Sequence, residues 1–582
     1  MISGAGFLIR LLVSAQLAAA DSAVYAPSSI TDMATYCALA DAILNGKLPD
    51  TFYYQPFYYS VLLPFCRFFS TSPWILIAVQ SLLGGAAVYL AGLAGAVTAG
   101  RNAGSWSALL CALSAILIYF TPYALLETLQ AFWIVLLFFL LLLALRKRKL
   151  LFWGLAGFVL GCSVLTRGNT WCFLPPVVFA AFYVWRANWK KTLLPLLLFL
   201  MFAILPQLPF AAYNSFRTGK LCGPSTAGGA VLCIGNNPES APGGLDIPYP
   251  PTYEAWMKTE KSVSIPARMF EWFRREPGAF LELQFNKFLL FWDSAEWPNN
   301  ITEYNARKSS LMRTLHFLPT GFLLTLALAG GFSGFRRRMF LRRKQFLLLW
   351  GFLLFYAFSV SAFYILARFR VPVIPLLCVS GGVFLAQIPG MLKTRRVLHL
   401  LLIMIAALLF AYVVYPVYSG TYEPVLMRFL RPHGTVSPLD DARSLIQDHA
   451  QRIRGGWGTM ALQDGMTIEK TFLLPRSGQG ARIKRLTLQF PVAGTDFSFQ
   501  MEVNGRQVFT VTEGPVTIPI PPSGNAENVQ ISLRIRNVQG DPQLCFDTLR
   551  DYGRTQVDGK TVPCELVATL IEEFASDKDG RK

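Results

Sequence analysis

The sequence predicts a polytopic α-helical membrane protein with a C-terminal β-sandwich domain, and three observations support this. Hydrophobic residues make up 53% of the 582 residues and charged residues only 15%, with a mean hydropathy of +0.41. About eleven apolar runs are each long enough to cross roughly 30 Å of hydrocarbon. From about residue 440 the pattern changes to short segments in which apolar and polar residues alternate.

The apolar runs predict a membrane domain over residues 1–415. They lie near 4–20, 73–98, 105–121, 124–145, 150–166, 170–186, 192–212, 312–335, 345–364, 371–390 and 397–415. The first run also resembles a signal peptide that ends at Ala20, but it lacks a basic start and contains Arg10. We therefore interpret it as the first transmembrane helix.

The net charge of +19 follows this topology and does not indicate a nucleic-acid partner. Four loops between apolar runs hold basic clusters without an acid, at 146–149, 186–191, 336–344 and 393–396. With the N-terminus inside, alternation of the spans puts all four clusters in the cytoplasm, as the positive-inside bias requires. Membrane lipid headgroups are then their partners.

The same topology predicts which segments lie outside. Residues 21–72 and 213–311 form two outer loops, and the chain beyond residue 415 is also outside. Short loops and the absence of eukaryotic targeting signals favour a bacterial inner membrane with an extracytoplasmic C-terminal domain. In the larger loop, residues 266–292 predict one helix that lies on the membrane surface because aromatic residues dominate its end.

The first outer loop predicts an amphipathic helix from Ile30 to Asn45, ended by Gly46. Asp32 and Tyr36 are four residues apart, so they share one face of this helix. A carboxylate held there can act as a general base toward an acceptor hydroxyl or amine. The alternative is that Asp32 only complements the dipole at the helix N-terminus.

Further polar candidates lie at the outer ends of apolar spans. Glu127 is a candidate for positioning a sugar or a cation, because an acid is costly to bury there; exposure at the interface is the alternative. Arg167, Arg368 and Arg370 suit phosphate oxygens, and Lys287 is a weaker fourth candidate. Snorkelling toward lipid headgroups is the alternative for these cations.

The chain lacks the sequence motifs of several common enzyme classes. There is no Walker loop, no HExxH and no GxSxG, and the four histidines are dispersed, which argues against a His-built metal site. A requirement for a divalent metal remains open.

Two cysteine pairs are candidate disulfides, because Cys222 and Cys233 share one outer loop and Cys545 and Cys564 share the C-terminal domain. Asn300 begins an Asn-Ile-Thr glycosylation sequon.

Five motifs, taken together and in order, resemble the GT-C superfamily of glycosyltransferases that use sugars carried on polyprenyl phosphate. The resemblance is to family 39, the branch of the protein O-mannosyltransferases and aminoarabinose transferases, and covers roughly residues 1–415. The motifs are Asp32-x-x-x-Tyr36, Gln55-Pro-Phe-Tyr58, Leu165-Thr-Arg167, Asn214 to Gly219, and Ala367-Arg-Phe-Arg-Val-Pro-Val-Ile-Pro375.

This resemblance implies a GT-C fold and inverting transfer of a sugar from dolichyl or undecaprenyl phosphate at the outer face. The acceptor would be a lipid, a glycan or a protein. It implies Asp32 as the catalytic base and Arg368 and Arg370 as ligands of the donor phosphate. The remaining matched positions, and with them the other candidates, become substrate-binding residues: Tyr36, Gln55, Tyr58, Glu127, Arg167 and Lys287.

The chain departs from the family pattern at two places. Met33 stands where the family usually has a second acid after the catalytic one, which argues against a paired-carboxylate site. Tyr213-Asn214 stands where an Arg-Asn pair often precedes the large loop.

The C-terminal segment predicts a β-sandwich over residues 440–582, after a linker at 416–439. Segments of period two occur at 486–491, 497–503, 516–520 and 529–535. The Asn504-Gly505 turn between Val503 and Phe509 predicts a hairpin. The hairpin resembles those of carbohydrate-binding modules, so acceptor-glycan binding is one hypothesis, and a structural cap is the alternative.

Two other functions remain open on the sequence. One is a lipid-linked glycan polymerase or ligase, and the other is a lipid or sugar transporter of the flippase type. Transporters usually contain paired inverted halves with broken helices at the midplane. This chain instead has its polar candidates at one face and carries two unequal outer loops, which favours chemistry at the membrane surface.

Overall fold

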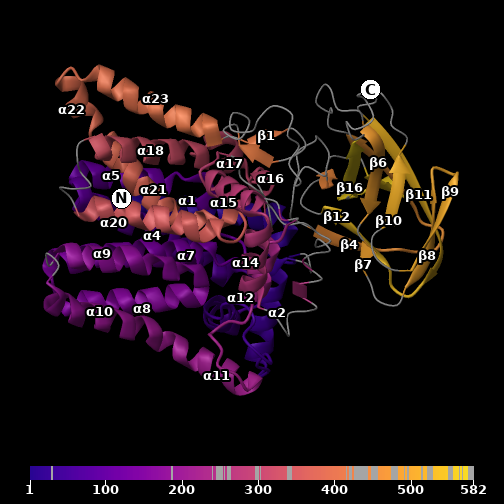
Figure 1. Ribbon diagram of the computed structural model, residues 1–582, viewed down its shortest axis with the longest axis horizontal. Helices are drawn as coiled ribbons and strands as arrows, with labels where there is room; N and C mark the ends of the chain where they lie inside the picture. The colour runs from indigo at the N-terminus through magenta and orange to yellow at the C-terminus, as the bar shows by residue number, and fades with distance from the viewer. Residues whose placement is uncertain are drawn as a thin grey trace.

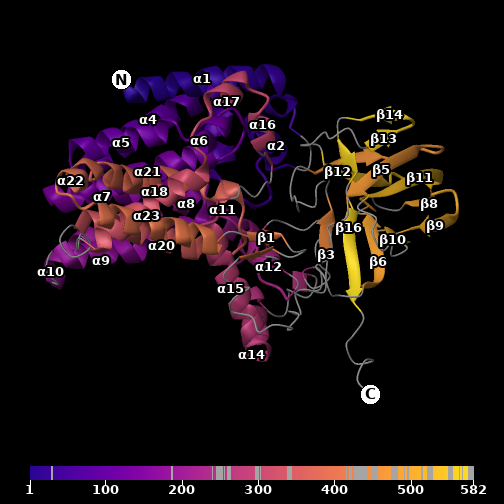
Figure 2. The same cartoon turned by 90° about the horizontal axis from the view of Figure 1, so that it is seen from above.

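The computed structural model describes residues 1–27, 31–184, 188–238, 264–294, 303–336 and 344–414, isolated positions between 240 and 301, and, beyond 415, mainly strands and tight turns. It has a body of long helices and a β-rich C-terminal part beside one end of that body (Figure 1). Figure 2 shows the same arrangement from above, with the strands again next to one end of the helices.

Within the described ranges, seven helical segments are long and apolar enough to cross a membrane. They are α1 (Ile2–Ala20), α4 (Trp74–Ala99), α7 (Glu127–Lys147), Lys190–Thr218 with α10 (Trp189–Ile204) and α11 (Leu208–Thr218), α20 (Lys344–Ser361), Ala367–Lys393 with α21 (Ile374–Leu385) and α22 (Ile388–Lys393), and α23 (Val397–Val414). Three shorter apolar helices are α8 (Leu150–Thr166), α9 (Leu174–Val184, preceded by the 3-10 turn Gly168–Phe173) and α18 (Thr320–Arg336). The polytopic helical prediction is confirmed, and the count of eleven spans stays a prediction.

The predicted span at 105–121 is divided into two helices, α5 (Arg101–Ala112) and α6 (Ala115–Tyr119). At the break, the backbone N–H of Ala115 donates to the carbonyl of Leu318 at 2.9 Å, and Leu318 donates back to Leu113 at 2.9 Å. These backbone groups bond to another segment, so the helix does not continue through them.

Glycines allow the helices of the body to approach closely. A Cβ on Gly104 of α5 would lie 2.6 Å from the carbonyl oxygen of Gly92 in α4. A Cβ on Gly157 of α8 would lie 2.1 Å from the carbonyl oxygen of Phe199 in α10. Such small residues are typical of helix contacts in membranes, where backbones pack against one another.

The two predicted outer loops form the end of the body next to the β-rich part (Figure 1). The first contains α2 (Asp32–Leu44), a π-helical turn (Tyr58–Leu62) and α3 (Leu63–Phe69). The second contains α12 (Gly228–Gly235), α14 (Ile265–Arg275), α15 (Pro277–Phe291), α16 (Glu303–Ala306) and α17 (Ser310–Leu315). The α7–α8 connection and α22, which are basic, lie at the opposite end (Figure 1). Which end faces outward stays a prediction.

Two helix predictions for these loops are refined by the structure. The helix expected from Ile30 to Asn45 is α2, capped by Thr31, and Ile30 itself lies outside the described residues. The single helix expected at 266–292 is wrong, because it is two helices that meet at Glu276. Pro277 disfavours helical geometry at the residue before it, and Glu276 has φ −135° and ψ 65°.

The C-terminal part consists of strands in several antiparallel sheets. The main strands are β3 (Arg443–Ile446), β4 (Trp457–Ala461), β5 (Thr467–Leu473), β6 (Ile483–Phe490), β8 (Ser498–Val503), β9 (Gln507–Val511), β10 (Val516–Ile520), β11 (Asn528–Gln539), β12 (Gln543–Asp547) and β16 (Ala568–Phe574). The sheet orders are β10-β6-β16-β3, β14-β13-β5-β11-β8-β9 and β15-β12-β4. The strands β13 (Thr555–Val557), β14 (Lys560–Thr561) and β15 (Glu565–Leu566) are short, and the short strand β7 (Val492–Ala493) pairs with β12 beside the third order. A small hairpin of β1 (Pro416–Tyr418) and β2 (Tyr422–Pro424) lies in the predicted linker.

Each of the four segments with period two contains a strand in the structure: β6, β8, β10 and β11. Asn504 and Gly505 both have positive φ, 51° and 66°, and join β8 to β9 as the predicted hairpin. Phe490, Leu533 and Leu544 come from three different sheets and belong to one buried apolar cluster. A two-layer sandwich and the domain boundaries at 415 and 440 stay predictions.

One candidate disulfide is not formed. Cys222 is a free thiol, and its sulfur lies 3.2 Å from the hydroxyl of Thr218, so it is not bonded to Cys233. The side chain of Cys545 lies outside the described part of the structure, so its pairing with Cys564 stays open.

Candidate active site

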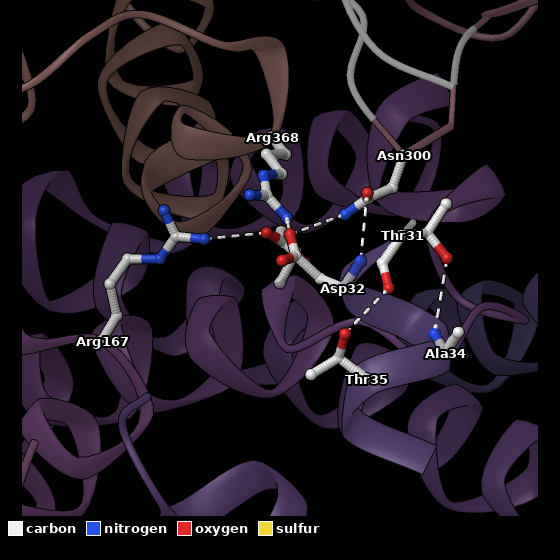
Figure 3. Close-up of polar contacts among 8 residues, drawn as sticks. Thr31, Asp32, Ala34, Thr35, Arg167, Asn300 and Arg368 are labelled. Atoms are coloured by element: carbon white, nitrogen blue, oxygen red, sulfur yellow. Dashed lines mark hydrogen bonds and ion pairs between the residues drawn. The ribbon is translucent and has the colours of Figure 1, made fainter. Parts of the chain in front are cut away.

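The local sequence starts α2 at Asp32. Thr31 caps the helix, and its hydroxyl oxygen accepts a hydrogen bond from the backbone N–H of Ala34 at 3.4 Å (Figure 3). The hydroxyl of Thr35 donates to the carbonyl oxygen of Thr31 at 3.3 Å. A threonine before the first turn and an acid within it are both favoured at a helix N-terminus. The helix therefore fixes the Asp32 carboxylate at the end of the body next to the strands.

The Asp32 carboxylate has two partners from distant parts of the chain (Figure 3). Asn300 donates from Nδ2 to Oδ2 at 2.9 Å, and its Oδ1 accepts from the backbone N–H of Asp32 at 3.4 Å. Arg368 donates from Nη1 to the same Oδ2 and forms an ion pair. Neither donor occupies Oδ1, and 25% of the Asp32 side chain is exposed, so a substrate can reach it.

These surroundings keep Asp32 ionised. Burial alone would raise the pKa of this carboxyl, but the charge of Arg368 and the hydrogen bonds from Asn300 and Arg368 outweigh that effect. Arg167 adds a smaller contribution in the same direction. The pKa of Asp32 is therefore lowered below its ordinary value. Asp32 is a carboxylate at neutral pH, as a base must be, but it is a weak base while Arg368 is bound to it.

A second ion pair joins the start of α7 to the end of α8. Arg167 donates from Nη2 to Oε1 of Glu127 at 2.8 Å. The Glu127 side chain is fully buried, and 15% of the Arg167 side chain is exposed. Among the described residues, no hydrogen-bond partner contacts the buried Oε2 of Glu127 or the buried Nε of Arg167. Buried polar atoms normally have partners, so these two atoms indicate where a substrate group can bind.

Phe369 connects the two ion pairs. The guanidinium of Arg167 lies 4.6 Å from the centre of its ring, and that of Arg368 lies 5.2 Å from it. Both distances are within the range of cation–π attraction. The ring therefore stabilises two positive charges in one region, where an anion can contact both.

Tyr36 and Tyr58 lie beside this region in an aromatic cluster. The ring centre of Tyr36 is 5.7 Å from that of Tyr58 and 5.9 Å from that of Tyr54. Burial, followed by the negative charge of Asp32, raises the pKa of Tyr36 well above its ordinary value, so its hydroxyl stays protonated. Tyr58 is fully buried and donates to Gln80 at 3.4 Å.

Gln55 lies against the residue that follows Arg167. A Cβ placed on Gly168 would be 2.8 Å from Nε2 of Gln55, which is closer than side chains normally approach. The glycine thus leaves space for the Gln55 amide next to the second ion pair. The structure brings Asp32, Arg368, Glu127, Arg167 and Gln55 together, with the tyrosines behind them. Their assignment as catalytic or substrate-binding residues stays a prediction.

Lys287 and Arg370 are placed differently from the other predicted site residues. Both are fully buried. Lys287 donates to the carbonyl oxygen of Gly235 and to Oδ1 of Asn236, the latter at 2.9 Å. Arg370 donates to the carbonyl oxygen of Asp293. Each cation thus has partners in the protein, and its role as a phosphate ligand stays a prediction.

Two residues of the site, Asn300 and Phe369, were not among the predicted site residues. Asn300 stood out only as the start of a sequon, and its bond to Asp32 joins positions 268 residues apart. Phe369 lies between two arginines that were singled out, but its ring contacts depend on the fold. No group of three or more His, Cys, Asp or Glu side chains that could hold a metal is found in the part of the chain that the structure describes.

Part of the chain matches a known protein family in sequence. Residues 10–220 match the family model described as dolichyl-phosphate-mannose-protein mannosyltransferase. The predicted resemblance to this GT-C family is confirmed. The matched range contains Asp32, Glu127 and Arg167 but ends before Lys287 and Arg368. No curated protein matches the chain in sequence.

Three solved structures illustrate the structural matches. The oligosaccharyltransferase AglB from Archaeoglobus fulgidus, in complex with an inhibitory peptide and a dolichol-phosphate, is 19% identical with a TM-score of 0.38, over 71% of this chain and 55% of that one. ArnT from Cupriavidus metallidurans bound to undecaprenyl phosphate is 14% identical with a TM-score of 0.40, over 66% and 59%. The arabinosyltransferase EmbB from Mycobacterium smegmatis is 12% identical with a TM-score of 0.26, over 98% and 65%. This chain thus spans little more than half the length of AglB and ArnT.

Proposed function

We propose that this protein is an integral-membrane glycosyltransferase that moves a sugar from a polyprenyl-phosphate donor to a lipid, glycan or protein acceptor. The family match over residues 10–220 supports this class of reaction. The observation that carries the proposal is the ion pair of Asp32 with Arg368, which lies beside a second pair formed by Glu127 and Arg167. A base and two guanidinium groups thus lie together at one end of the helical body.

Asp32 is the general base in this proposal. Its carboxylate takes the proton from the acceptor hydroxyl or amine as the acceptor atom bonds to the anomeric carbon of the sugar. The bond from that carbon to the phosphate oxygen breaks at the same time, and its electron pair stays on the oxygen. Attack from the side opposite the leaving phosphate inverts the anomeric configuration. The products are the glycosylated acceptor and polyprenyl phosphate.

Arg368 stabilises the leaving phosphate, and the charges of the site explain how Asp32 is released for this role. The two carboxylates and two guanidinium groups balance before a donor binds. A donor phosphate adds negative charge and competes with Asp32 for Arg368. When Arg368 turns to the phosphate, the pKa of Asp32 rises and its carboxylate becomes a stronger base. Donor binding thereby prepares the base for the acceptor.

Arg167 supplies a second positive charge to the phosphate, because Phe369 holds it next to Arg368. Glu127 keeps the Arg167 guanidinium in place through Oε1, and its buried Oε2 is available to accept a hydrogen bond from a sugar hydroxyl. Such preorganised charges stabilise the transition state because they need not rearrange during the reaction. The site lies at the outer face of a bacterial inner membrane in this proposal.

The test uses purified protein in lipid nanodiscs with a panel of undecaprenyl- and dolichyl-phosphate sugars and a cell-envelope extract as acceptor. We expect release of sugar from one donor, and a loss of about 10²–10⁴-fold in the Asp32→Asn variant. Asp41→Asn is the matched control, because Asp41 lies on the same helix and forms an ion pair with Arg67 at 2.6 Å outside the site. Transport of intact lipid without sugar release would identify a flippase instead, and formation of long glycans would identify a polymerase.

A further inference from the structure

Arg368 lies in the segment 362–373, which joins α20 to α21 and contains only short turns. Its described backbone contains the 3-10 turn Ala367–Phe369, followed by a second turn at Val371–Val373. An arginine on such a connection needs support from outside to keep its guanidinium in one position. The support comes from α15 and from the loop that α15 holds.

The first support begins at Lys287 in α15. Its ammonium donates to the carbonyl oxygen of Gly235 and to Oδ1 of Asn236. Nδ2 of Asn236 in turn donates to the carbonyl oxygen of Ala362 at 2.8 Å. Gly235 packs so closely on Phe363 that a Cβ would lie 2.1 Å from the Phe363 carbonyl oxygen. Lys287 therefore holds the Gly235 carbonyl, and it holds Asn236 together with Gln284, whose Nε2 donates to the same Oδ1 at 2.8 Å.

The second support lies just beyond the C-terminal end of the same helix. Arg370 donates to the carbonyl oxygen of Asp293, two residues after α15 ends at Phe291. The hydroxyl of Tyr356 in α20 donates to the carbonyl oxygen of Phe369 at 2.9 Å. Arg368 thus lies between two points that are tied to α15, one on each side of it in the chain.

Fold stability does not explain the presence of a lysine at position 287. The side chain is fully buried, and burial lowers the pKa of its amine well below the ordinary value. No carboxylate of the described residues forms an ion pair with it. Burial of an amine without an acid partner is costly, and an apolar side chain of similar size is often tolerated or more stable in its place. The hydrogen bonds to Gly235 and Asn236 are what the lysine contributes.

We propose that Lys287 and Arg370 are positioning residues that hold Arg368 against Asp32 and so place it for the donor phosphate. They act through Gly235, Asn236 and Asp293 and do not themselves contact the substrate. The effect on sugar transfer rests on the proposed function, whereas the effect on the geometry of Arg368 does not.

The first test measures that geometry without any substrate. Hydrogen exchange of the 361–370 peptide is followed by mass spectrometry in nanodiscs for the wild type, Lys287→Met and Lys344→Met. Lys344 is the matched control, because it also donates to a backbone carbonyl, that of Leu145 at 3.3 Å, at the far end of α20. We expect roughly 10-fold faster exchange in the Lys287→Met peptide and no change in the control. Equal exchange in Lys287→Met and wild type would overturn the proposal.

The second test uses sugar transfer. We expect Lys287→Met and Arg370→Met to lower kcat/KM for the donor by about 10²-fold, with the KM of the acceptor unchanged. Arg370→Lys keeps a donor for the Asp293 carbonyl and should restore part of the rate. The acid limb of the pH–rate profile should also move to higher pH, because a displaced Arg368 no longer lowers the pKa of Asp32. A loss of folding alone would not produce that shift.

The two tests together separate the possible failures. Faster exchange of the 361–370 peptide with unchanged donor kinetics would show that transfer does not depend on this support, and the proposal would be wrong. A wild type that is inactive with every donor would contradict the proposed function. In that case the exchange of Lys287→Met still decides whether Lys287 holds the Arg368 connection.

Discussion

Arg368 forms an ion pair with Asp32 across 336 positions of the chain. The carboxylate comes from α2, near the start of the chain, and the guanidinium comes from the connection before α21. Because the two residues lie near opposite ends of the sequence of the helical part, the site forms only when that whole part is assembled. The same pair sets the strength of Asp32 as a base.

Replacing Arg368 by glutamine should change how the reaction depends on pH. In the wild type the pKa of Asp32 is lowered. Asp32 therefore stays ionised and active as the pH falls to the ordinary pKa of an aspartate, about 4, and below it. Without the arginine, burial raises the pKa, so protonation begins at a higher pH. The acid limb of kcat/KM should therefore move to higher pH, in addition to a general loss of rate. Arg67→Gln, which removes the partner of Asp41, should leave the limb in place.

A profile of kcat/KM against pH, measured for these three proteins with one donor, checks this expectation. An acid limb in Arg368→Gln that coincides with the wild type would show that Asp32 is not the group that titrates.

Loss of Arg167 and loss of Glu127 should lower the free energy of unfolding by different amounts. Arg167→Met leaves a fully buried carboxylate without its cation, which should reduce the free energy of unfolding by about 3–5 kcal/mol. Glu127→Gln leaves a guanidinium that is 15% exposed, and we expect a smaller cost of about 1–3 kcal/mol. Adding Glu127→Gln to Arg167→Met should recover stability, because no buried charge is left without a partner.

Unfolding in nanodiscs, followed by intrinsic fluorescence, measures this cycle. Costs that simply add in the double variant would mean that the two side chains do not interact, contrary to their contact at 2.8 Å.

The fold and the candidate site were predictable from the sequence to different degrees. Apolar length alone indicates where helices cross a membrane, and alternation indicates strands such as β8 and β11. The break between α5 and α6 was not predictable, because it depends on hydrogen bonds to Leu318. Pro277 indicates the boundary between α14 and α15 in the sequence. The prediction of one continuous helix followed the aromatic residues of the segment instead.

The site residues show the same division. Glu127, Arg167 and Arg368 stood out because charges at the ends of apolar spans are unusual, and Asp32 stood out because it shares a face with Tyr36 on the predicted helix of the first outer loop. Which of them pair was not predictable, since pairing depends on segments brought together by the fold. Arg370 has the same residue type and nearly the same position as Arg368, yet it is fully buried and bonds to a backbone carbonyl.

Replacing Phe369 by leucine should lower the affinity of the site for the donor phosphate. The ring lies 4.6 Å from one guanidinium and 5.2 Å from the other, and cation–π contacts contribute about 0.5–2 kcal/mol each. We expect the KM of the donor to rise about 10-fold, while Phe369→Trp keeps most of the affinity. Phe358→Leu is the control, because that ring stacks on Phe288 on an exposed face of α20. Equal KM values in Phe369→Leu and the control would contradict the role of the ring.

Gly168→Ala should reveal whether Gln55 contacts the substrate. The added methyl group would lie 2.8 Å from Nε2 of Gln55, and the flexible end of that side chain can move away, so the fold should persist. If the amide binds the sugar, Gly168→Ala and Gln55→Ala should each lower kcat/KM by about 10-fold. The double variant should be no worse than either, because both changes remove the same contact. Gly228→Ala is the control, since a Cβ there meets no atom within 4 Å. Effects that multiply in the double variant would show that Gly168 and Gln55 act separately.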